Sequence, residues 1–404
     1  MNEGRDLLMV SVSGPDRPGI TAALTRIMVE HHVDVVDIEQ ASLQDLLALT
    51  FLVDLAQASS TEDGLIKDLL FEGRRFNLTL NFRLFSPREV QAAGRRKLYV
   101  LTFFGGTSAL YELSNILGQE NANIEMISSL TQHCAKCVEM IVNLRDAENL
   151  GRLKKRVLAM SHELNVDLAF QAMETYRKNK RLIFFDMDST LVDMEVIDEL
   201  ARAAGVFPEV ARVTEKAMRG ELDFEDALIQ RVALLRGLKV EVMEKIRDEM
   251  KLSAGVEQVV ATLKNLGYKL AVLTGGFDFF AEHLQARLSL DFAFANHLEI
   301  KDGALTGRVV GRIIDAAQKA RILNQVAREQ GVMLDQTVAV GDGANDALML
   351  GQAGLGLSYN AKPILDRVAH SAIGYTRLMN ILYLLGISED DISPPPAGPS
   401  ARIT

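Results

Sequence analysis

The stretch that most constrains this chain is residues 181–192, RLIFFDMDSTLV. Its apolar run, Leu182–Phe185, is short, uninterrupted and rich in aromatic residues, which is typical of a strand buried on both faces of a parallel sheet. Two carboxylates, Asp186 and Asp188, follow directly. Ligands of open α/β sheets bind beyond the carboxyl ends of the strands, so both are predicted to lie where chemistry occurs. Helix capping is the alternative interpretation for a single Asp.

Strand and helix patterns alternate through the second half of the chain. This alternation predicts an α/β fold with a doubly wound, mostly parallel, Rossmann-like sheet. A charged, helix-rich segment at about residues 193–254 is predicted to be a helical cap inserted into that fold. Residues 181–390 are therefore expected to form one domain, and the Pro-rich tail, 391–404, is expected to be disordered.

The first half repeats one order of elements, strand–helix–strand–strand–helix–strand, in residues 1–88 and again in residues 95–174. That order is the ferredoxin-like α+β unit. In the first copy, residues 14–20 (GPDRPGI) lead into a helix whose free N–H groups can receive a carboxylate. Asp16 and Gly19 are the candidate effector-binding residues, and a tight turn without a ligand is the alternative.

This loop and the order of elements resemble the ACT domain, a small regulatory module. The resemblance implies that an amino-acid effector, such as serine, binds between paired copies, and that the chain forms a homodimer. The second copy has residues 104–108 (FGGTS) at the equivalent place and lacks the Asp-x-Pro-Gly pattern. For that copy, pairing or spacing is the alternative role.

Composition excludes several classes of protein. The net charge of −10, from 44 basic and 54 acidic residues, predicts no basic face for nucleic acid. No apolar run approaches the roughly 20 residues that cross a bilayer, and the first residues lack an apolar signal segment, so a cytoplasmic location without membrane contact is expected. Cys134 and Cys137 form a C-x-x-C pair, for which a redox pair or half a zinc site are the alternatives. No further zinc ligands follow at the usual spacing, so two thiols in or beside a strand turn are expected.

Four motifs fall at successive strand ends or helix starts of the α/β half: residues 186–190 (DMDST), 274–276 (TGG), Lys319 and residues 341–346 (GDGAND). Phosphoryl transfer needs a nucleophile in line, cations on the phosphate oxygens and a proton donor for the leaving alkoxide. Asp186 can attack as a carboxylate and form an acyl phosphate. Asp188 can protonate the departing oxygen and later deprotonate water.

The other motif residues suit a cation and a phosphate. Mg²⁺ favours carboxylate oxygens and keeps water and substrate phosphate as further ligands. The candidate metal ligands are Asp186, Asp188 and Asp342. The candidate phosphate contacts are Thr274, Gly275 and Gly276, which offer a hydroxyl and a closely approaching backbone. Lys319 can neutralise the transferring group, although a helix lysine is usually solvated. Asn345 and Asp346 begin the next helix, so capping is the alternative for both; their spacing from Asp342 favours a functional role for at least one, and Asn345 is the candidate substrate contact.

At these motifs the chain resembles the haloacid dehalogenase superfamily of phosphatases, over residues 181–385. Three further runs resemble the phosphoserine phosphatase family: residues 218–225 (MRGELDFE), 231–237 (RVALLRG) and 360–363 (NAKP). The resemblance implies Mg²⁺-dependent hydrolysis of O-phospho-L-serine to L-serine and phosphate, the last step of serine biosynthesis, through an aspartyl-phosphate intermediate.

The resemblance also implies roles for residues of the cap. In the phosphoserine phosphatase family a Glu after the first motif receives the substrate ammonium, and Glu195 holds that place. An Arg of the cap receives the carboxylate, and Arg231 matches it; Met218 and Phe224 match the apolar residues that close over the substrate. Arg pairs two-to-two with a carboxylate, and Glu suits an ammonium, although a solvated surface charge is the alternative for either alone. Thr274 stands where the family more often has Ser, and it keeps the hydroxyl.

Two other functions remain open at this point. A phosphotransferase would pass the phosphoryl group from Asp186 to another alcohol, such as homoserine, and would differ only in its acceptor. An amino-acid sensor would work through the two N-terminal modules and carry a vestigial phosphatase. Because every chemical motif is intact, hydrolysis with regulation by the N-terminal modules is the favoured interpretation.

Overall fold

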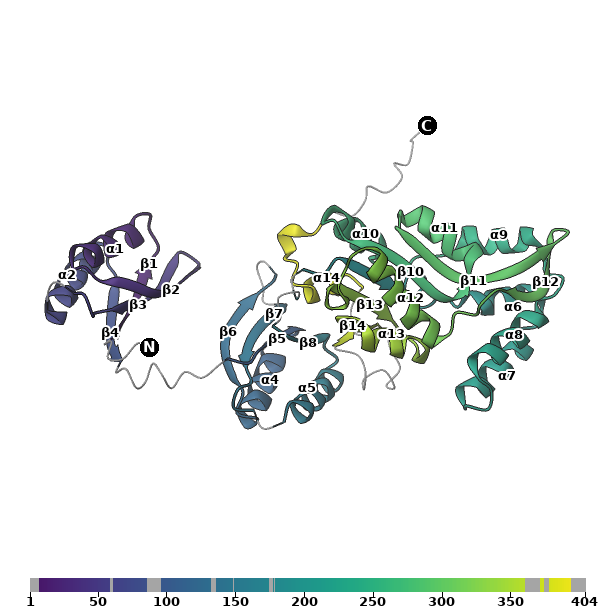
Figure 1. The fold of residues 1–404 in the computed structure, drawn as a ribbon, viewed down its shortest axis with the longest axis horizontal. Helices are drawn as coiled ribbons and strands as arrows, with labels where there is room; N and C mark the ends of the chain where they lie inside the picture. The colour runs from purple at the N-terminus through teal and green to yellow at the C-terminus, as the bar shows by residue number, and fades with distance from the viewer. Residues whose placement is uncertain are drawn as a thin grey trace, which may run out of the picture. The chain divides into compact units, whose positions relative to one another are not determined.

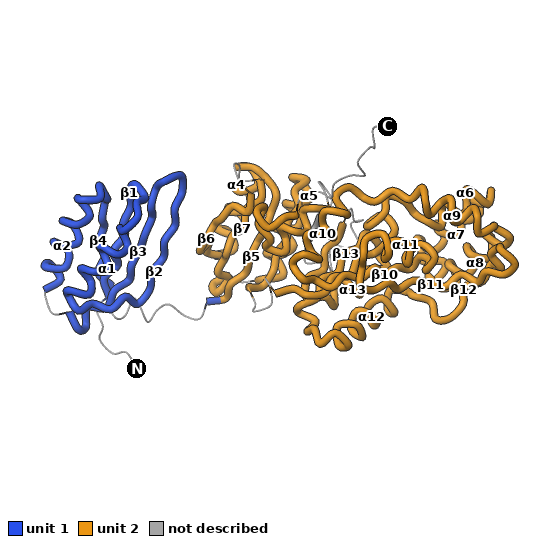
Figure 2. The backbone as a smooth tube through the Cα atoms, turned by 90° about the horizontal axis from the view of Figure 1, so that it is seen from above, with its two compact units in different colours: residues 1–96 blue, residues 97–404 orange. Residues whose placement is uncertain are grey.

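The structure is a computed structural model that describes residues 7–58, 61–85, 96–131, 136–147, 149–173, 177, 179–359, 371–373 and 378–393. It divides into two compact units, residues 1–96 and residues 97–404 (Figure 2). Cys134, the run 360–363 and all but the first three residues of the predicted tail lie outside the described residues.

The first unit is an antiparallel sheet covered by two helices (Figure 1). Its elements are β1 (Leu7–Pro15), α1 (Ile20–Glu30), β2 (Asp34–Leu43), β3 (Leu46–Asp54), α2 (Glu62–Arg75) and β4 (Thr79–Phe85). The strand order is β2-β3-β1-β4. Leu24 of α1 and Leu69 of α2 share one core with Val10 of β1, since alternate strand residues face the helices. The predicted ferredoxin-like fold is confirmed for this copy.

The second copy repeats this architecture at the start of the second unit. Its elements are β5 (Leu98–Phe104), α4 (Thr107–Gln119), β6 (Asn123–Ser129), β7 (Cys137–Asn143), α5 (Leu150–Leu164) and β8 (Leu168–Ala172). The order β6-β7-β5-β8 is that of the first unit. The register matches as well, because Leu98 lies opposite Asn143 as Leu7 lies opposite Asp54.

The α/β half is built on a parallel sheet with β9 in its middle. Its strands are β9 (Leu182–Phe185), β10 (Lys269–Phe277), β11 (Phe292–Lys301), β12 (Ala304–Val310), β13 (Thr337–Gly341), β14 (Leu355–Tyr359) and β15 (Ser371–Ile373). β9 pairs in parallel with β10 on one side and β13 on the other, and β12 is antiparallel to β11 at the edge. The predicted strand over Leu182–Phe185 is confirmed.

Helices cover both faces of this sheet, which explains the uninterrupted apolar run of β9. Ile183 and Phe185 share a core with α10 (Val256–Asn265), α11 (Asp278–Leu288) and α14 (Asn380–Leu384). Leu182 and Phe184 share the opposite core with α12 (Ala316–Glu329) and α13 (Ala347–Gln352). Alternate residues of a strand point to opposite faces, so all four are apolar. The predicted doubly wound fold is confirmed.

Four helices form the cap, drawn above and below β11 and β12 in Figure 1: α6 (Val196–Ala204), α7 (Phe207–Met218), α8 (Phe224–Leu234) and α9 (Val240–Glu249). The two segments that join the cap to the core lie against each other. The N–H of Asp193 donates to the carbonyl of Lys251 (3.1 Å), and the N–H of Ser253 donates to the carbonyl of Leu191 (3.0 Å). We call residues 191–193 and 251–253 the hinge ribbon.

The sheet of the second copy continues into the sheet of the α/β half. β8 pairs antiparallel with β15, with Ala169 opposite Ser371 and Leu168 opposite Ala372. One sheet of eleven strands therefore runs from β12 to β6. The sequence predicts separate domains over residues 95–174 and 181–390, and no pattern in it indicates this junction.

Side chains reinforce the junction between the second copy and α14. The side-chain amide of Asn380 donates to Asp167 (2.6 Å), and that of Gln171 donates to the carbonyl of Leu384 (3.0 Å). The rings of Phe104 and Tyr383 meet edge to face with their centroids 5.4 Å apart. The second copy is thus packed on the α/β half by main-chain, polar and aromatic contacts.

The junction predicts how truncated chains behave. Residues 97–404 keep all eleven strands, so we expect their thermal unfolding midpoint to equal that of the second unit in the full chain. Residues 175–404 lack β8, which exposes the edge of β15 and the ring of Tyr383, so we expect a midpoint lower by about 5–10 °C and a tendency to associate. Calorimetry and size-exclusion chromatography measure both, and equal midpoints for the two fragments would show that the junction adds no stability.

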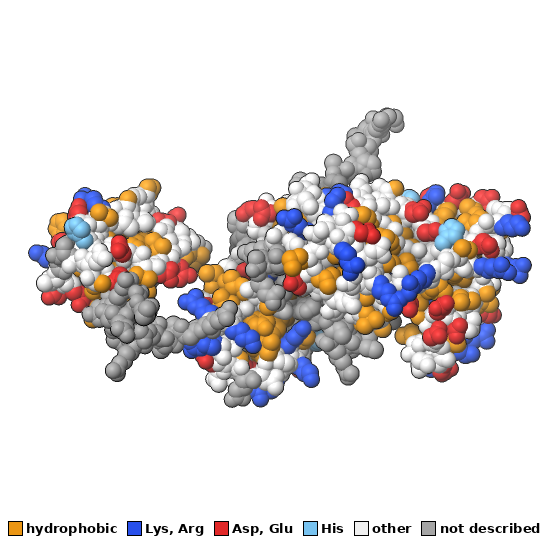
Figure 3. Space-filling view, viewed as in Figure 1, with side chains coloured by type: hydrophobic (Ala, Val, Ile, Leu, Met, Phe, Trp, Pro, Cys, Tyr) orange, Lys and Arg blue, Asp and Glu red, His pale blue; other side chains and the backbone are white. Residues whose placement is uncertain are grey.

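The surface carries mixed charge. On the face drawn in Figure 3, acidic and basic side chains are interspersed among apolar patches on both units. Within the described ranges, none of the helices combines the length and apolar content that a bilayer crossing requires.

Candidate active site

The four sequence motifs meet at one edge of the sheet. Asp186 follows β9, Asp342 follows β13 and Thr274 lies near the end of β10. These three strands are adjacent and parallel, so their carboxyl ends share an edge, which is where α/β proteins bind ligands. Lys319 reaches the same place from the first turn of α12.

Lys319 lies in a buried charge cluster. Its side chain is 0% exposed, and Nζ lies 3.0 Å from Oδ1 of Asp186 and 2.7 Å from Oδ1 of Asp346. Burial opposes its charge, but the ion pairs with Asp186 and Asp346 outweigh burial and raise the pKa of Lys319. Lys319 is therefore a fixed cation between two carboxylates, and the alternative of a solvated helix lysine does not apply.

Three carboxylates form the group that suits a cation. One oxygen each of Asp186, Asp342 and Asp346 lie within 4.8 Å of one another. Burial and the charge of Asp186 raise the pKa of Asp342 to about 7, and the same causes raise the pKa of Asp346 to about 7. The excess of negative charge and the all-oxygen donor set fit Mg²⁺. Since a cation binds the ionised form, protons compete with it here.

Asp188 lies beside this group and is not a member of it. Its Oδ1 accepts the N–H of Val196 (3.2 Å). Burial, together with the charges of Glu195 and Asp186, holds the pKa of the Asp188 carboxyl well above its usual range. A carboxyl whose pKa is raised is better suited to act as a general acid. The metal role predicted for Asp188 stays a prediction, and the direction of this pKa shift fits its predicted role as an acid.

The Thr274 loop is an irregular part of β10. The strand runs past Leu273 to Phe277 with a shift in its register against β11. Thr274 is buried, and its Oγ1 accepts the N–H of Gly276 (2.9 Å). A Cβ on Gly276 would lie 3.0 Å from Oδ2 of Asp188 and 3.2 Å from Oγ1 of Thr274. Glycine thus lets the first motif and this loop approach each other closely.

The last motif makes a tight turn, η2 (Ala344–Asp346), between β13 and α13. A side chain on Gly341 would collide with Asp346, and one on Gly343 would collide with Asn345. The two glycines therefore explain the spacing of the motif, because they leave room for both polar side chains beside Asp342. Helix capping is the alternative that the sequence leaves open for Asp346, and the structure shows both arrangements: Oδ2 of Asp346 accepts the N–H of Gly343 (3.2 Å) at the start of η2, and the side chain also belongs to the carboxylate group.

Phe224 places the cap over residues 274–276, the predicted phosphate contacts, which we call the phosphate loop. A Cβ on Gly275 would lie 2.9 Å from Cζ of Phe224, which begins α8. Met218, at the end of α7, is 67% exposed, so it does not cover the loop in this conformation. Of the two apolar residues predicted to close over substrate, Phe224 alone lies at the loop here.

Glu195 immediately precedes α6, Arg231 lies in α8, and the charge of Glu195 acts on the pKa of Arg231. Glu195 accepts the hydroxyl of Ser189 (2.9 Å), whose left-handed backbone (φ 55°) is a strained conformation of the kind found at functional sites. Burial lowers the pKa of Arg231, while Asp198, Glu195 and Asp188 act in the opposite sense. Arg231 is therefore a desolvated cation close to the first motif.

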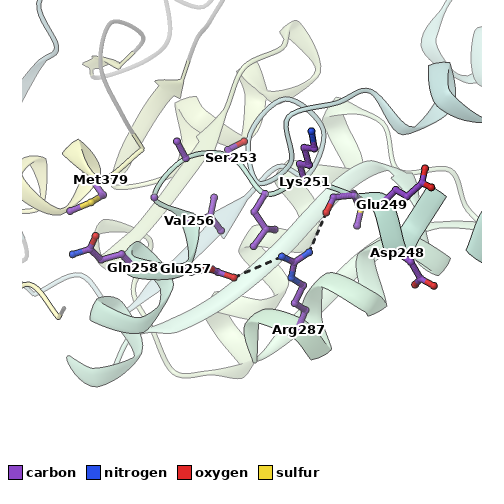
Figure 4. A pocket seen from close by; sticks show the side chains of 13 residues that line it. Asp248, Glu249, Lys251, Ser253, Val256, Glu257, Gln258, Arg287 and Met379 are labelled. Carbon is purple, nitrogen blue, oxygen red and sulfur yellow. Dashed lines mark hydrogen bonds and ion pairs between the residues drawn. The ribbon is translucent and has the colours of Figure 1, made fainter. Parts of the chain in front are cut away.

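A pocket of about 840 Å³ borders the hinge ribbon (Figure 4). Arg287 lies at its side, with its guanidinium 3.8 Å from the Glu257 carboxylate and donating to the carbonyl of Met250 (3.2 Å). Met379, just before α14, lines it as well. None of the motif carboxylates lines this pocket, so we place the chemistry at the sheet edge and not in it.

The N-terminal candidates lie on the surface of the first unit. Asp16 is exposed, and its Oδ2 accepts the hydroxyl of Ser42 (2.8 Å). Gly19 has a left-handed backbone (φ 94°), which glycine adopts without strain, and the space around it is open.

In the second copy, burial raises the pKa of the Cys137 thiol to about 12, which fits an inert thiol.

Comparisons with known proteins agree with this geometry. Residues 180–354 match the haloacid dehalogenase-like hydrolase family, and residues 6–83 match the ACT domain. Phosphoserine phosphatase of Streptomyces coelicolor is 41% identical over 390 residues, which cover 95% of this chain and 93% of that protein. The phosphoserine phosphatase of Mycobacterium tuberculosis is 36% identical over 395 residues, covering 97% and 96%.

Two solved structures share the fold over much of the chain. A haloacid dehalogenase family hydrolase from Salmonella enterica serovar Typhi has a TM-score of 0.62 at 28% identity and covers 71% of this chain and 98% of its own. A probable phosphoserine phosphatase from Vibrio cholerae has a TM-score of 0.57 at 34% identity and covers 71% and 86%. The chain is therefore a phosphatase that belongs to the phosphoserine phosphatase family of haloacid dehalogenase-like hydrolases.

Proposed function

We propose that the chain hydrolyses O-phospho-L-serine to L-serine and phosphate through a phosphoryl group carried on Asp186. The observation that carries this proposal is the fully buried Lys319, whose Nζ lies between the carboxylates of Asp186 and Asp346 at the carboxyl ends of β9 and β13. An anionic phosphoryl group needs a fixed cation beside the nucleophile, and Lys319 meets that need.

The two carboxylates of the first motif divide the chemistry. Asp186 attacks phosphorus, and the ester bond to the serine Oγ breaks as Asp188 donates its proton to that oxygen. Asp188, now ionised, takes a proton from a water molecule that attacks the phosphoryl group. The bond to Asp186 breaks, phosphate leaves, and both carboxyls return to their starting forms.

The surrounding residues stabilise the charge that develops. Asp186, Asp342 and Asp346 would hold Mg²⁺, which supplies positive charge to the phosphoryl oxygens when bound. Lys319 supplies a further fixed charge, and Thr274 and the backbone beside it offer hydrogen bonds. Because these groups are held by strands and buried helix contacts, they need little reorganisation during the reaction.

The cap would select the amino acid and exclude water. Glu195 is suited to receive the ammonium, and Arg231 to pair with the carboxylate of the substrate. Both lie on cap helices or their starts, so substrate binding would hold the cap closed over the phosphate loop. The position of Phe224 at Gly275 supports closure in this sense.

Substrate and metal dependence test the proposal together. We expect phosphate release from phosphoserine to exceed that from simple phosphomonoesters, such as p-nitrophenyl phosphate, and to vanish with a chelator and return with Mg²⁺. A colorimetric phosphate assay on the full chain measures this. Unselective hydrolysis would contradict the roles of Glu195 and Arg231, and release that persists in chelator would contradict the metal role of the three carboxylates.

Removing the guanidinium of Arg231 should weaken recognition of the amino-acid part of the substrate without weakening recognition of the phosphoryl part. For Arg231→Ala we expect kcat/KM for phosphoserine to fall about 30–100-fold, because a charged, two-point hydrogen bond is lost, while kcat/KM for p-nitrophenyl phosphate changes less than about threefold. Steady-state kinetics measure both. Arg212→Ala, on the exposed surface of α7, is the matched control and should change neither. Equal losses on the two esters would refute carboxylate recognition by Arg231.

We further propose that an amino acid such as serine binds the first unit near Asp16 and Gly19 and changes activity, and that the protein works in the cytoplasm as a homodimer. The match of residues 6–83 to the ACT domain supports the regulatory part. Serine titration of the full chain and of residues 97–404 tests it. Inhibition that is identical in both would show that the first unit does not take part in the regulation.

A further inference from the structure

Asn296 is a buried polar residue that the proposed mechanism leaves without a role. It lies in β11 and is 1% exposed. Its Nδ2 donates to the carbonyl of Gly275 (2.8 Å), and its Oδ1 accepts the N–H of Ile314 (2.8 Å). Both ends of one rigid amide are thus bound to main chain, on one side in the phosphate loop and on the other at the approach to α12.

The bond to Gly275 compensates for an irregular strand. In the pairing of β10 with β11, Leu273 lies opposite Phe294, and Phe277 lies opposite Asn296. Between these two pairs, β10 has three residues, 274–276, whereas β11 has one, Ala295. Such a bulge releases main-chain groups from the ladder, as a loop that binds phosphate through its N–H groups requires. A released carbonyl away from water needs another partner, and the amide of Asn296 is that partner for Gly275.

The bond to Ile314 fixes the start of the helix that holds Lys319. Ile314 is followed by Asp315, whose side chain caps α12 by accepting the N–H of Gln318 (2.7 Å). The carbonyl of Asp315 accepts the N–H of Lys319 itself (2.9 Å). A displacement of Ile314 would therefore displace the first turn of α12 and move Nζ of Lys319 relative to the sheet edge.

We propose that Asn296 is a positioning residue that holds the phosphate loop and the first turn of α12 at a fixed separation, so that Thr274 and Lys319 reach the same phosphoryl group. The inference rests on the phosphoryl chemistry proposed above and not on the amino-acid part of the substrate. Stabilising groups act only when held in place, and a shift of about 1 Å can lower a rate about 100-fold.

The test replaces Asn296 by a residue of similar size that makes neither bond. For Asn296→Leu we expect kcat to fall about 30–100-fold on both phosphoserine and p-nitrophenyl phosphate, with each KM within about threefold of its original value. Inhibition by orthovanadate, which imitates the transferring phosphoryl group, should weaken by a similar factor. This pattern differs from that of Arg231→Ala, which affects phosphoserine alone.

Thr262→Val is the matched control for loss of a buried hydrogen-bonding group. Thr262 lies in α10, is 0% exposed, donates to the carbonyl of Gln258 (2.8 Å) and accepts the N–H of Ser393 (3.1 Å). We expect a lower unfolding midpoint with unchanged kcat and unchanged orthovanadate inhibition. If Asn296 only stabilised the fold, Asn296→Leu would show this same pattern, a lower unfolding midpoint with unchanged kcat and unchanged orthovanadate inhibition.

Each outcome decides the inference. If folded Asn296→Leu keeps kcat within threefold, or loses activity on phosphoserine alone, Asn296 does not position the phosphoryl site. If Asn296→Leu does not fold, Asn296→Ser, which keeps one hydroxyl at this place, is measured instead. A loss of kcat on both esters that is smaller than the loss expected for Asn296→Leu supports the inference. An unchanged kcat contradicts it. If the unaltered chain hydrolyses only p-nitrophenyl phosphate, the proposed substrate is wrong, and the same comparison on that ester still decides the role of Asn296.

Discussion

Asp186→Asn should lower turnover of phosphoserine by at least about 10⁴-fold, because an amide cannot attack phosphorus to form the acyl phosphate. The fold should persist, since the change removes one buried negative charge from a crowded group and Lys319 keeps Asp346 as its partner. Phosphate release in the steady state measures the rate. Mass spectrometry of acid-quenched samples should show a phosphoryl adduct on the unaltered chain and none on the variant.

Asp248→Asn is the matched control for this substitution, because Asp248 lies on α9 with a side chain that is 62% exposed. We expect unchanged turnover and an unchanged adduct. Near-normal turnover by Asp186→Asn, or a phosphoryl adduct at another residue, would contradict the assignment of the nucleophile.

Lys319→Met should lower kcat by about 10²–10³-fold, since it removes the fixed cation from the transferring group while keeping the bulk of the side chain. The same change leaves Asp186, Asp342 and Asp346 with one positive charge less, so we expect Mg²⁺ to bind more tightly as kcat falls. Steady-state kinetics over a range of Mg²⁺ concentrations measure both effects.

Lys245→Met provides the comparison for Lys319→Met. Lys245 forms an exposed ion pair with Glu249 on α9, and such pairs contribute little, so kcat and Mg²⁺ affinity should both stay unchanged. Weaker Mg²⁺ binding by Lys319→Met would show that the lysine supports the metal site indirectly and would overturn the charge argument.

Sequence reasoning predicted the elements with strong local signals. The apolar run of β9 and its two following carboxylates placed the sheet edge correctly, because alternation along a strand buried on both faces leaves a continuous apolar pattern. The repeated order of strand and helix patterns predicted both ferredoxin-like units, because each element has its own hydrophobic period. These signals lie within a few neighbouring residues, where hydrophobic period and turn chemistry act directly.

The features that sequence reasoning missed depend on residues far apart in the chain. The junction of β8 and β15 joins residues near 169 and 371, and a strand of three residues has no hydrophobic period of its own. Asp346 was ambiguous because a carboxylate at a helix start serves equally as cap or ligand. Asn296 belongs to no motif, and only the register shift of β10 reveals what its amide does.

The hinge ribbon has a consequence for how the cap moves. A cap tied by two separate loops can rotate about either one, whereas two segments joined by hydrogen bonds in opposite directions resist twisting and bend mainly across their flat face. We therefore expect the cap to rotate about a single axis through the hinge ribbon. Phe224 would return to the same point above Gly275 in each cycle, so the hinge ribbon, and not the contacts between the cap and the sheet edge, would set how accurately the cap closes.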